Sequence, residues 1–345
     1  MLTIEEIRKI KYPSELFSED IETMKKQYVE LMKIYHPDLN EQKQEYIEVT
    51  EKINKLYKEA ESNIEKGIWN KPGMIKLKKS DGKYYMMKFR ISHNFELGKM
   101  YIGNEIVLYL FNEENEKFAL NALKQIKNLK YANDDMEKEF SKYMPRIITS
   151  FRTVTGKRGI VFEKEEDLIL LRDLLTYYKG KVSVNTASWV LSNLYNISCF
   201  LHYNELTHNG ITIDSYFVST SRRYGVLIGG WWYSVREGER LLSVAKSIEH
   251  LMPYEMKISN KANSLLDLES IRLLGRRLLG DESGDLLSVD GDVPSTLNSW
   301  LKAKAGSNPF QEYSTWSNVV NSIGELKVKR KIIDKDELYK KIGGR

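Results

Sequence analysis

Three consecutive residues, His36, Pro37 and Asp38, bring an imidazole, a helix-breaking ring and a carboxylate together in this 345-residue chain. Apolar residues recur at helical spacing on both sides of them, over 21–35 and 46–64. Proline cannot continue the first helix, so the triplet is predicted to lie in the bend between two antiparallel helices. Residues in an exposed bend more often serve function than packing, and we therefore interpret the triplet as a contact site.

This arrangement resembles the J-domain, the module by which DnaJ-type co-chaperones contact Hsp70. In that family the His-Pro-Asp triplet triggers ATP hydrolysis by the Hsp70 partner, and a basic patch precedes it in the second helix. The residues here that would form the patch are Lys25, Lys26 and Lys33, with Val29 and Glu30 interrupting it. The resemblance implies that these lysines and the triplet contact an Hsp70.

Cys199, His202 and His208 are the side chains that invite a zinc site. Cys199 and His202 are three residues apart on a predicted helix and share one face. A structural zinc normally needs four protein ligands, and the sequence offers no evident fourth. No metal and no cofactor are therefore predicted.

Composition limits the function classes. Hydrophobic residues make up 41% of the chain and aromatic residues 11%, which supports folded cores. The net charge of +5 is too small to indicate nucleic-acid binding by itself. A single cysteine excludes an intramolecular disulfide. We see no secretory signal and no apolar run of about 18 residues, so we expect a cytoplasmic protein with no membrane contact.

Shifts in composition divide the chain into parts. The fold class is predicted to be α+β, with an all-α helical hairpin followed by strand-rich and helix-rich regions. Turn residues near Asn70–Gly73 predict a linker. The predicted parts are the helical domain 1–67, the linker 68–73, the strand-rich region 74–164, the helix-rich region 165–325 and a basic tail 326–345, peripheral or helical.

The order of elements from residue 74 onward resembles the two-lobed protein-kinase fold, with 74–164 as the small lobe and 165–325 as the large lobe. Residues 96–103, with Gly98, resemble a shortened glycine-rich turn, and 206–218 resemble the catalytic loop. Asp267 resembles the aspartate that anchors this loop in kinases.

The kinase resemblance also implies which residues stand where phosphoryl transfer needs charged groups. Kinases use, in chain order, a lysine, a glutamate, an aspartate, an asparagine and a second aspartate at these positions. The corresponding residues here are Tyr109, Asn121, Gly210, Ser215 and Gly229, while His208, Gly230 and Asp267 complete the degenerate pocket. Without carboxylates, Mg²⁺ ions cannot be held beside nucleotide phosphates, so we expect a catalytically inactive pseudokinase.

Gly229 and Gly230 are followed by three large aromatic residues, Trp231, Trp232 and Tyr233. Exposed residues of these types serve as anchors in protein interfaces. Alternatively, they fill the cleft that nucleotide occupies in an active kinase, and this second interpretation is favoured because large aromatic side chains are mostly buried.

The two resemblances together imply a J-domain co-chaperone that recruits and stimulates a DnaK-type Hsp70 toward an unidentified protein client held by the inactive kinase-like domain. The layout resembles J-domain proteins with kinase-like C-terminal regions from bacteria and bacteriophages, which implies a bacterial cytoplasm as the location. Two alternatives stay open: an atypical nucleotide-dependent enzyme of kinase fold, and a scaffold with a vestigial J-domain.

Overall fold

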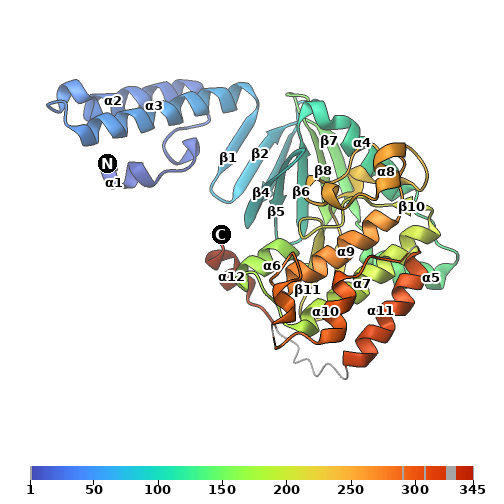
Figure 1. Ribbon diagram of the computed structural model, residues 1–345. Coiled ribbons are helices and arrows are strands. Elements are labelled where there is room, and N and C mark those ends of the chain that lie inside the picture. Colours follow the sequence, from blue (N-terminus) through green and yellow to red (C-terminus); the bar gives the residue numbers. More distant parts are fainter. Residues whose placement is uncertain (1, 290, 307, 324–331, 345) are drawn as a thin grey trace.

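The computed structural model describes residues 2–289, 291–306, 308–323 and 332–344. Along the chain, N-terminal helices are followed by a small sheet, a larger sheet and a group of helices (Figure 1). The predicted α+β class is confirmed. Within the described ranges no helix is both long enough and apolar enough to cross a membrane.

Two long antiparallel helices, α2 (Ile21–Tyr35) and α3 (Gln44–Glu65), form the N-terminal domain with the short helix α1 (Ile4–Lys9). Thr3 begins α1 with a capping box, and the Asp20 carboxylate accepts a hydrogen bond from the Thr23 amide at the start of α2 (2.8 Å). The apolar stripes of the helices meet in one core. Its members include Ile7, Met24, Tyr35, Val49, Ile53 and Leu56.

A three-stranded sheet connects this domain to the rest of the chain. It consists of β1 (Ile68–Lys71), β2 (Met74–Lys78) and β3 (Tyr84–Lys88) in that order. The predicted linker at 68–73 is therefore wrong, because β1 pairs with β2 across a two-residue turn in which Gly73 has a φ of 70°. Trp69 is buried in the core of the N-terminal helices.

A five-stranded antiparallel sheet forms the body of the small lobe, and it has two apolar faces. Strand residues alternate between them: Met100 and Ile102 face the main core, whereas Tyr101 faces the three-stranded sheet. Helix α4 (Glu116–Lys127) covers the first face through Phe118 and Ala122. The strand order is β4 (Ile91–Phe95), β5 (Gly98–Ile102), β6 (Ile106–Phe111), β8 (Arg158–Glu163) and β7 (Ile147–Arg152).

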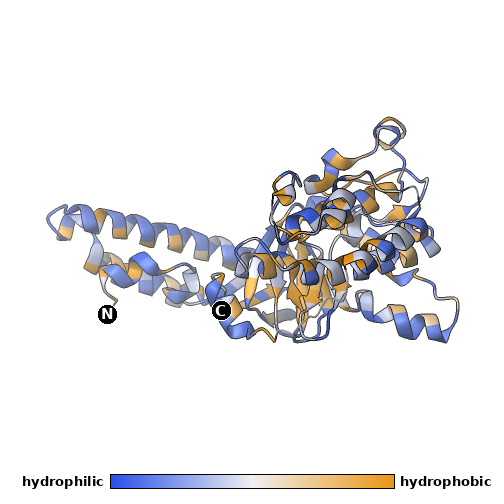
Figure 2. Ribbon diagram, turned by 60° about the horizontal axis from the view of Figure 1, so that its bottom comes forward, coloured by the Kyte–Doolittle hydropathy of each residue, from blue (hydrophilic) through white to orange (hydrophobic). Residues whose placement is uncertain are grey.

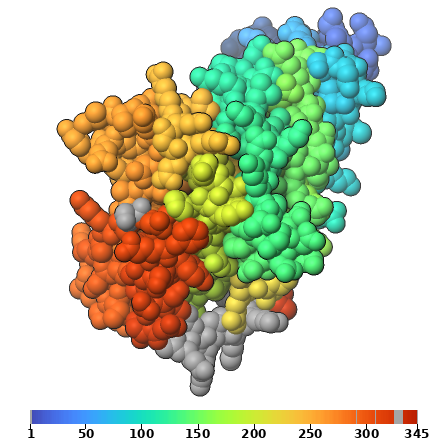
Figure 3. Space-filling view, turned by 90° about the vertical axis from the view of Figure 1, so that its right-hand side faces the viewer, coloured from blue at the N-terminus to red at the C-terminus, as the bar shows by residue number. Residues whose placement is uncertain are grey.

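The large lobe is built around α7 (Val184–Tyr203), which is apolar over most of its surface and is surrounded by other helices. Figure 3 shows this lobe, yellow to red, beside the small lobe in cyan and green. Figure 2 shows that hydrophobic residues concentrate inside the larger body, whereas the two long N-terminal helices are mostly hydrophilic. The other helices are α5 (Asp134–Phe140), α6 (Leu171–Tyr177), α8 (Tyr254–Ser259), α9 (Leu265–Leu278), α10 (Ser295–Lys302) and α11 (Pro309–Ile323).

Short strands complete the large lobe near the boundary between the lobes. Two of them lie at the two ends of the predicted catalytic loop, 206–218, and the others precede or follow it in the chain. Their bounds are β9 (Ile169–Leu170), β10 (Leu206–Thr207), β11 (Tyr216–Ser219), β12 (Tyr224–Leu227) and β13 (Val235–Arg236).

The predicted tail at 326–345 ends in a docked helix, α12 (Lys335–Lys341). Leu338 and Tyr339 are buried in the main core beside α6, and the Glu166 carboxylate accepts from Lys335 (2.9 Å). The peripheral interpretation is therefore wrong for this part, because two adjacent apolar side chains give the helix a face to bury. Residues 326–331 lie outside the described residues.

Candidate functional site

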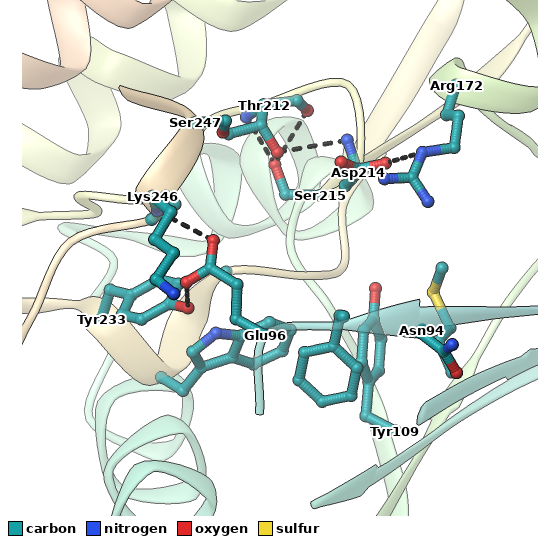
Figure 4. A pocket seen from close by; sticks show the side chains of 16 residues that line it. Asn94, Glu96, Tyr109, Arg172, Thr212, Asp214, Ser215, Tyr233, Lys246 and Ser247 are labelled. Atoms are coloured by element: carbon teal, nitrogen blue, oxygen red, sulfur yellow. Dashed lines mark hydrogen bonds and ion pairs between the residues drawn. The ribbon is translucent and has the colours of Figure 1, made fainter. Parts of the chain in front are cut away.

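A cleft with about 360 Å³ of free space lies between the lobes (Figure 4). The turn after β4 and Tyr109 of β6 line it from the small lobe, while 210–215 line it from the large lobe. Residues 230–233 and 245–247 close its sides. Of the positions selected from the kinase resemblance, the lining includes Tyr109, Gly210, Ser215 and Gly230, whereas Gly98, Asn121, His208, Gly229 and Asp267 are not part of it.

Tyr109, which the sequence resemblance assigns to the lysine position, is 1% exposed. Burial raises the pKa of its hydroxyl well above the usual range, so the group is neutral. Its ring packs against Trp232 at 4.9 Å between centroids. A Cβ atom at Gly229 would lie 2.6 Å from the Tyr109 hydroxyl. The Tyr109 hydroxyl thus occupies the space in front of Gly229, while its ring packs against Trp232.

The three aromatic residues after Gly230 are buried, with exposed fractions of 0%, 4% and 3% for Trp231, Trp232 and Tyr233. Gly230 has a φ of 84°, which turns the chain inward before them. The Trp231 indole donates to the Leu227 carbonyl (2.6 Å). The predicted partner anchor is wrong, because none of these rings is available at the surface, and the cleft-filling interpretation fits their packing.

Asn121 of α4, which the sequence resemblance assigns to the glutamate position, connects the helix to the aromatic segment. Its amide donates to the carbonyl oxygens of Trp232 (3.1 Å) and Ser234 (2.8 Å). The helix is thereby held against the aromatic segment by neutral hydrogen bonds, while Glu116 at its start forms ion pairs with Arg158 of β8 (2.7 Å) and Arg152 of β7 (3.4 Å).

Asp267, at the start of α9, holds the predicted catalytic loop. Its carboxylate accepts from the backbone amides of His208 (2.6 Å) and Asn209 (2.7 Å), in agreement with its expected anchoring role. Burial raises the pKa of Asp267 to about 7, against the opposing effect of these hydrogen bonds. Burial also lowers the pKa of His208 to about 3, so the imidazole is neutral where it packs against Trp231.

Gly210 and Ser215 contribute no charge to the cleft. A Cβ atom at Gly210 would lie 2.9 Å from the Tyr233 ring, so the tyrosine occupies the space of a larger residue. The Ser215 hydroxyl donates to the Thr212 carbonyl (3.0 Å) and accepts from the Thr212 amide (2.9 Å). Ser215 therefore shapes its own turn.

Gly98 lies outside the lining of the cleft, although it was predicted to be part of the pocket. A Cβ atom there would lie 2.1 Å from the Leu110 carbonyl oxygen. The absence of a side chain at Gly98 is required by close pairing of β5 with β6, which is a structural role.

The charged groups in the cleft were missed by sequence reasoning. Asp214 forms an ion pair with Arg172, and burial raises the pKa of the Asp214 carboxyl. Glu96 accepts from the Tyr233 hydroxyl and the Lys246 amide, each at 2.8 Å. Both carboxylates are thus engaged by protein groups. In the described part of the chain, no group of three or more metal-ligating side chains is present, and Cys199, His202 and His208 do not converge.

The second candidate site is the bend between α2 and α3. The His36 and Asp38 side chains are 44% and 67% exposed. The Asp38 amide donates to His36 Nδ1 (3.2 Å), and Asn40 donates to the carbonyls of Ile34 and His36 (both 2.9 Å), which fixes the bend. Lys25, Lys26 and Lys33 are exposed along α2 before it.

The fold places the chain among proteins with the two-lobed protein-kinase architecture. A solved structure described as that of vaccinia related kinase 3 is similar, with a TM-score of 0.51 and 16% sequence identity over 76% of this chain and 94% of that chain. At this identity the likeness concerns the fold alone. No family model matches the chain. No curated protein matches it either.

Proposed function

We propose that this protein is a J-domain-type co-chaperone whose kinase-like domain is catalytically inactive. The observation that carries the proposal is the exposed His36-Pro37-Asp38 triplet at the tip of an antiparallel helical hairpin. The Asn40 side chain and the Pro37 ring also define the bend, and the imidazole and the carboxylate add only local hydrogen bonds, with the Asp38 amide and the Gln42 side chain. Such residues are better explained by contact with a partner.

The polar surface of α2 supports the same proposal. Its buried side is used by the hairpin core, whereas Lys25, Lys26 and Lys33 project into solvent in the approach to the triplet. Lys26 precedes His36 by ten residues, which is about 15 Å along a helix. Together they offer an Hsp70 a surface with lysines along the helix, interrupted by the exposed Val29 and by Glu30, and with the triplet at its tip.

The cleft supports the inactive part of the proposal. Electrostatic stabilisation of the transferring phosphoryl group is the main contribution of a kinase active site. Here an aromatic ring fills the lysine position, and the nearby carboxylates are engaged by Arg172, Tyr233 and Lys246. We accordingly expect no saturable rise of melting temperature with Mg²⁺-ATP, since a ligand of the native state would raise it. A saturable rise would favour the nucleotide-dependent alternative.

The decisive experiment measures ATP turnover of a bacterial Hsp70 with and without the purified protein. Wild-type protein is expected to accelerate turnover several-fold, and His36→Gln or Asp38→Asn to remove the acceleration. Both sites are exposed, so each change should alter the free energy of unfolding by no more than about 0.5 kcal/mol.

The matched control is His250→Gln, which replaces another exposed histidine, in the large lobe. It should stimulate the Hsp70 as well as the wild type does. Equal stimulation by the wild type and both triplet variants would refute the proposal, and so would no stimulation by the wild type.

A further inference from the structure

Strand β3 is an open edge of the three-stranded sheet. The amide of Lys79 donates to the Lys83 carbonyl, and that of Phe89 to the Gly73 carbonyl, both at 2.8 Å. This register directs alternate backbone groups toward β2 and leaves those of Tyr84, Met86 and Lys88 pointing outward. Within the described ranges β3 pairs with β2 alone. Tyr84 and Met86 therefore present unused donors and acceptors along one line, and Lys88 adds its outward N–H, while its carbonyl oxygen lies against Gly103.

Natural edge strands are protected from pairing by being very short, by charged side chains, lysine above all, by proline, or by a cover. Strand β3 has five residues and carries Lys88 at its end, but three of its residues are exposed. The strand reads Tyr-Tyr-Met-Met-Lys, which has high strand propensity and no proline. Tyr84 is 48% exposed and Met86 is 62% exposed. The strand is therefore accessible and suited to accept another strand.

The chain that forms this sheet is strongly basic. Between residues 66 and 90 the sequence holds eight lysine or arginine residues and one aspartate. Lys76 and Lys79 are paired with Glu19 and Asp81. Lys78, Lys83 and Lys88 have no ion pair within the described part of the chain. By alternation along the strands, Lys78 and Lys88 share the exposed face of Tyr84 and Met86, whereas Lys83 precedes them on the opposite face. The face beside the open edge therefore attracts acidic groups.

The opposite side of the edge is apolar. A groove with about 450 Å³ of free space lies beside the end of β3 and the turn between β5 and β6. Met87, Phe89 and Ile106 line it, with Glu105 as an acidic member. A strand added to β3 would thus have lysines along one face and an apolar groove along the other.

We propose that an extended peptide with alternating acidic and apolar residues binds as a fourth strand along β3. Its backbone would pair with Tyr84, Met86 and Lys88, and its acidic side chains would lie beside the lysines. Its apolar side chains would enter the groove, because successive side chains of a strand point to opposite faces. The site goes beyond the proposed function and does not depend on contact with an Hsp70.

A peptide explains more of this surface than a nucleic acid does. A single-stranded nucleic acid would use the lysines and stack on Tyr84. It would leave the outward backbone groups and the apolar groove unused. The proposal therefore commits to a peptide, and binding of an oligonucleotide in its place is an outcome that would overturn it.

The test measures binding of a fluorescent ten-residue peptide of alternating Glu and Val to the full chain by anisotropy. Met86→Pro removes one outward N–H without touching the bonds to β2, and proline is tolerated at such edge positions. It should weaken binding at least tenfold. The matched control Met86→Ala keeps the N–H and should weaken binding less than threefold. Thermal unfolding checks that both variants are folded.

A second arm needs no variant of the protein. Two peptides carry N-methyl groups, one on every Glu and the other on every Val. Because alternate N–H groups of a strand point to the same side, one peptide should lose at least tenfold in affinity while the other binds. Lys78→Glu with Lys88→Glu should weaken binding of the unmodified peptide, as should added salt.

Three results would overturn the proposal. These are no binding of the unmodified peptide, equal binding of both methylated peptides, and binding unaffected by Met86→Pro. Selective binding of a ten-nucleotide single strand, with the peptide failing to bind, would assign the basic face to nucleic acid.

Discussion

Asp267 shows how one buried carboxylate organises a loop that carries no catalytic charge. It holds the amides of His208 and Asn209 in a setting where burial raises its pKa to about 7. Between pH 4 and 7 the folded protein therefore retains a proton that the unfolded chain releases. Its contribution to stability falls as pH rises through this window.

This pH dependence of stability can be tested with Asp267→Asn, because the asparagine side chain does not titrate. The free energy of unfolding of the wild type, minus that of the variant, should fall between pH 4 and 7 by at most about 1.4 kcal/mol per pH unit. His208, with its pKa lowered to about 3, acts with the opposite sign and cancels in the difference. Urea denaturation at several pH values measures this difference in the free energy of unfolding. A difference that stays constant with pH would contradict the raised pKa of Asp267.

Gly230 is the residue on which the aromatic filling of the cleft depends. A Cβ atom there would lie 2.4 Å from His208 Cε1 and 2.7 Å from the Gly210 carbonyl oxygen. Gly230→Ala should destabilise by about 1–3 kcal/mol more than Gly238→Ala, in which φ is also positive but nothing lies within 4 Å. Thermal or urea unfolding compares the two. Equal effects would show that the loop can relax around the methyl group.

Helix α4 is fastened to the aromatic segment through Asn121 in place of a charged pair. Asn121→Ala leaves two carbonyl groups without donors and should cost about 1–3 kcal/mol. Asn121→Asp should cost more, because a carboxylate would face two carbonyl oxygens. Leu120→Ala, on the same helix and 48% exposed, is the control. Urea denaturation ranks the three variants by their free energies of unfolding. A smaller loss for Asn121→Asp than for Asn121→Ala would contradict the role given to these two hydrogen bonds.

The elements that the sequence predicted best depend on local interactions. The capping box of Thr3 and the cap of Asp20 follow from residues three apart, and the two helical stripes follow from periodicity. The hairpin at Pro72–Gly73 was missed because the same two residues suit a hinge and a tight turn. Only the burial of Trp69, a tertiary contact, distinguishes them.

The site was predictable where order along the chain sufficed and not where distant residues meet. Asp267 was placed by its position at the start of a helix. Glu96 and Tyr233 are 137 residues apart, and no local pattern signals their hydrogen bond. The burial of Trp231 was likewise not predictable. Its residue type suits both a surface contact and the filling of a cleft, and only the packing of the folded chain distinguishes the two.

At the scale of the molecule, the paired strands at 68–78 attach the N-terminal helices without a flexible segment. Trypsin should therefore not cut first at Lys66 or Lys71 in the wild type. Trp69→Ala opens the contact between β1 and the helices and should make these cuts early. Tyr84→Ala, at an exposed aromatic residue of the same sheet, should not. Mass spectrometry of the first fragments identifies the cut sites. Early cutting of the wild type at Lys66 or Lys71 would support a flexible hinge at 68–73.

The length of α3 has a spatial consequence. Its 22 residues span about 33 Å, from the bend that carries His36 to the strand that contains Trp69. The helix is a rigid spacer that extends away from the two-lobed body (Figure 1). A large ATPase bound at the bend could then avoid a steric clash with the two-lobed body. A peptide bound at the other end of the helix would be held about 33 Å from that ATPase.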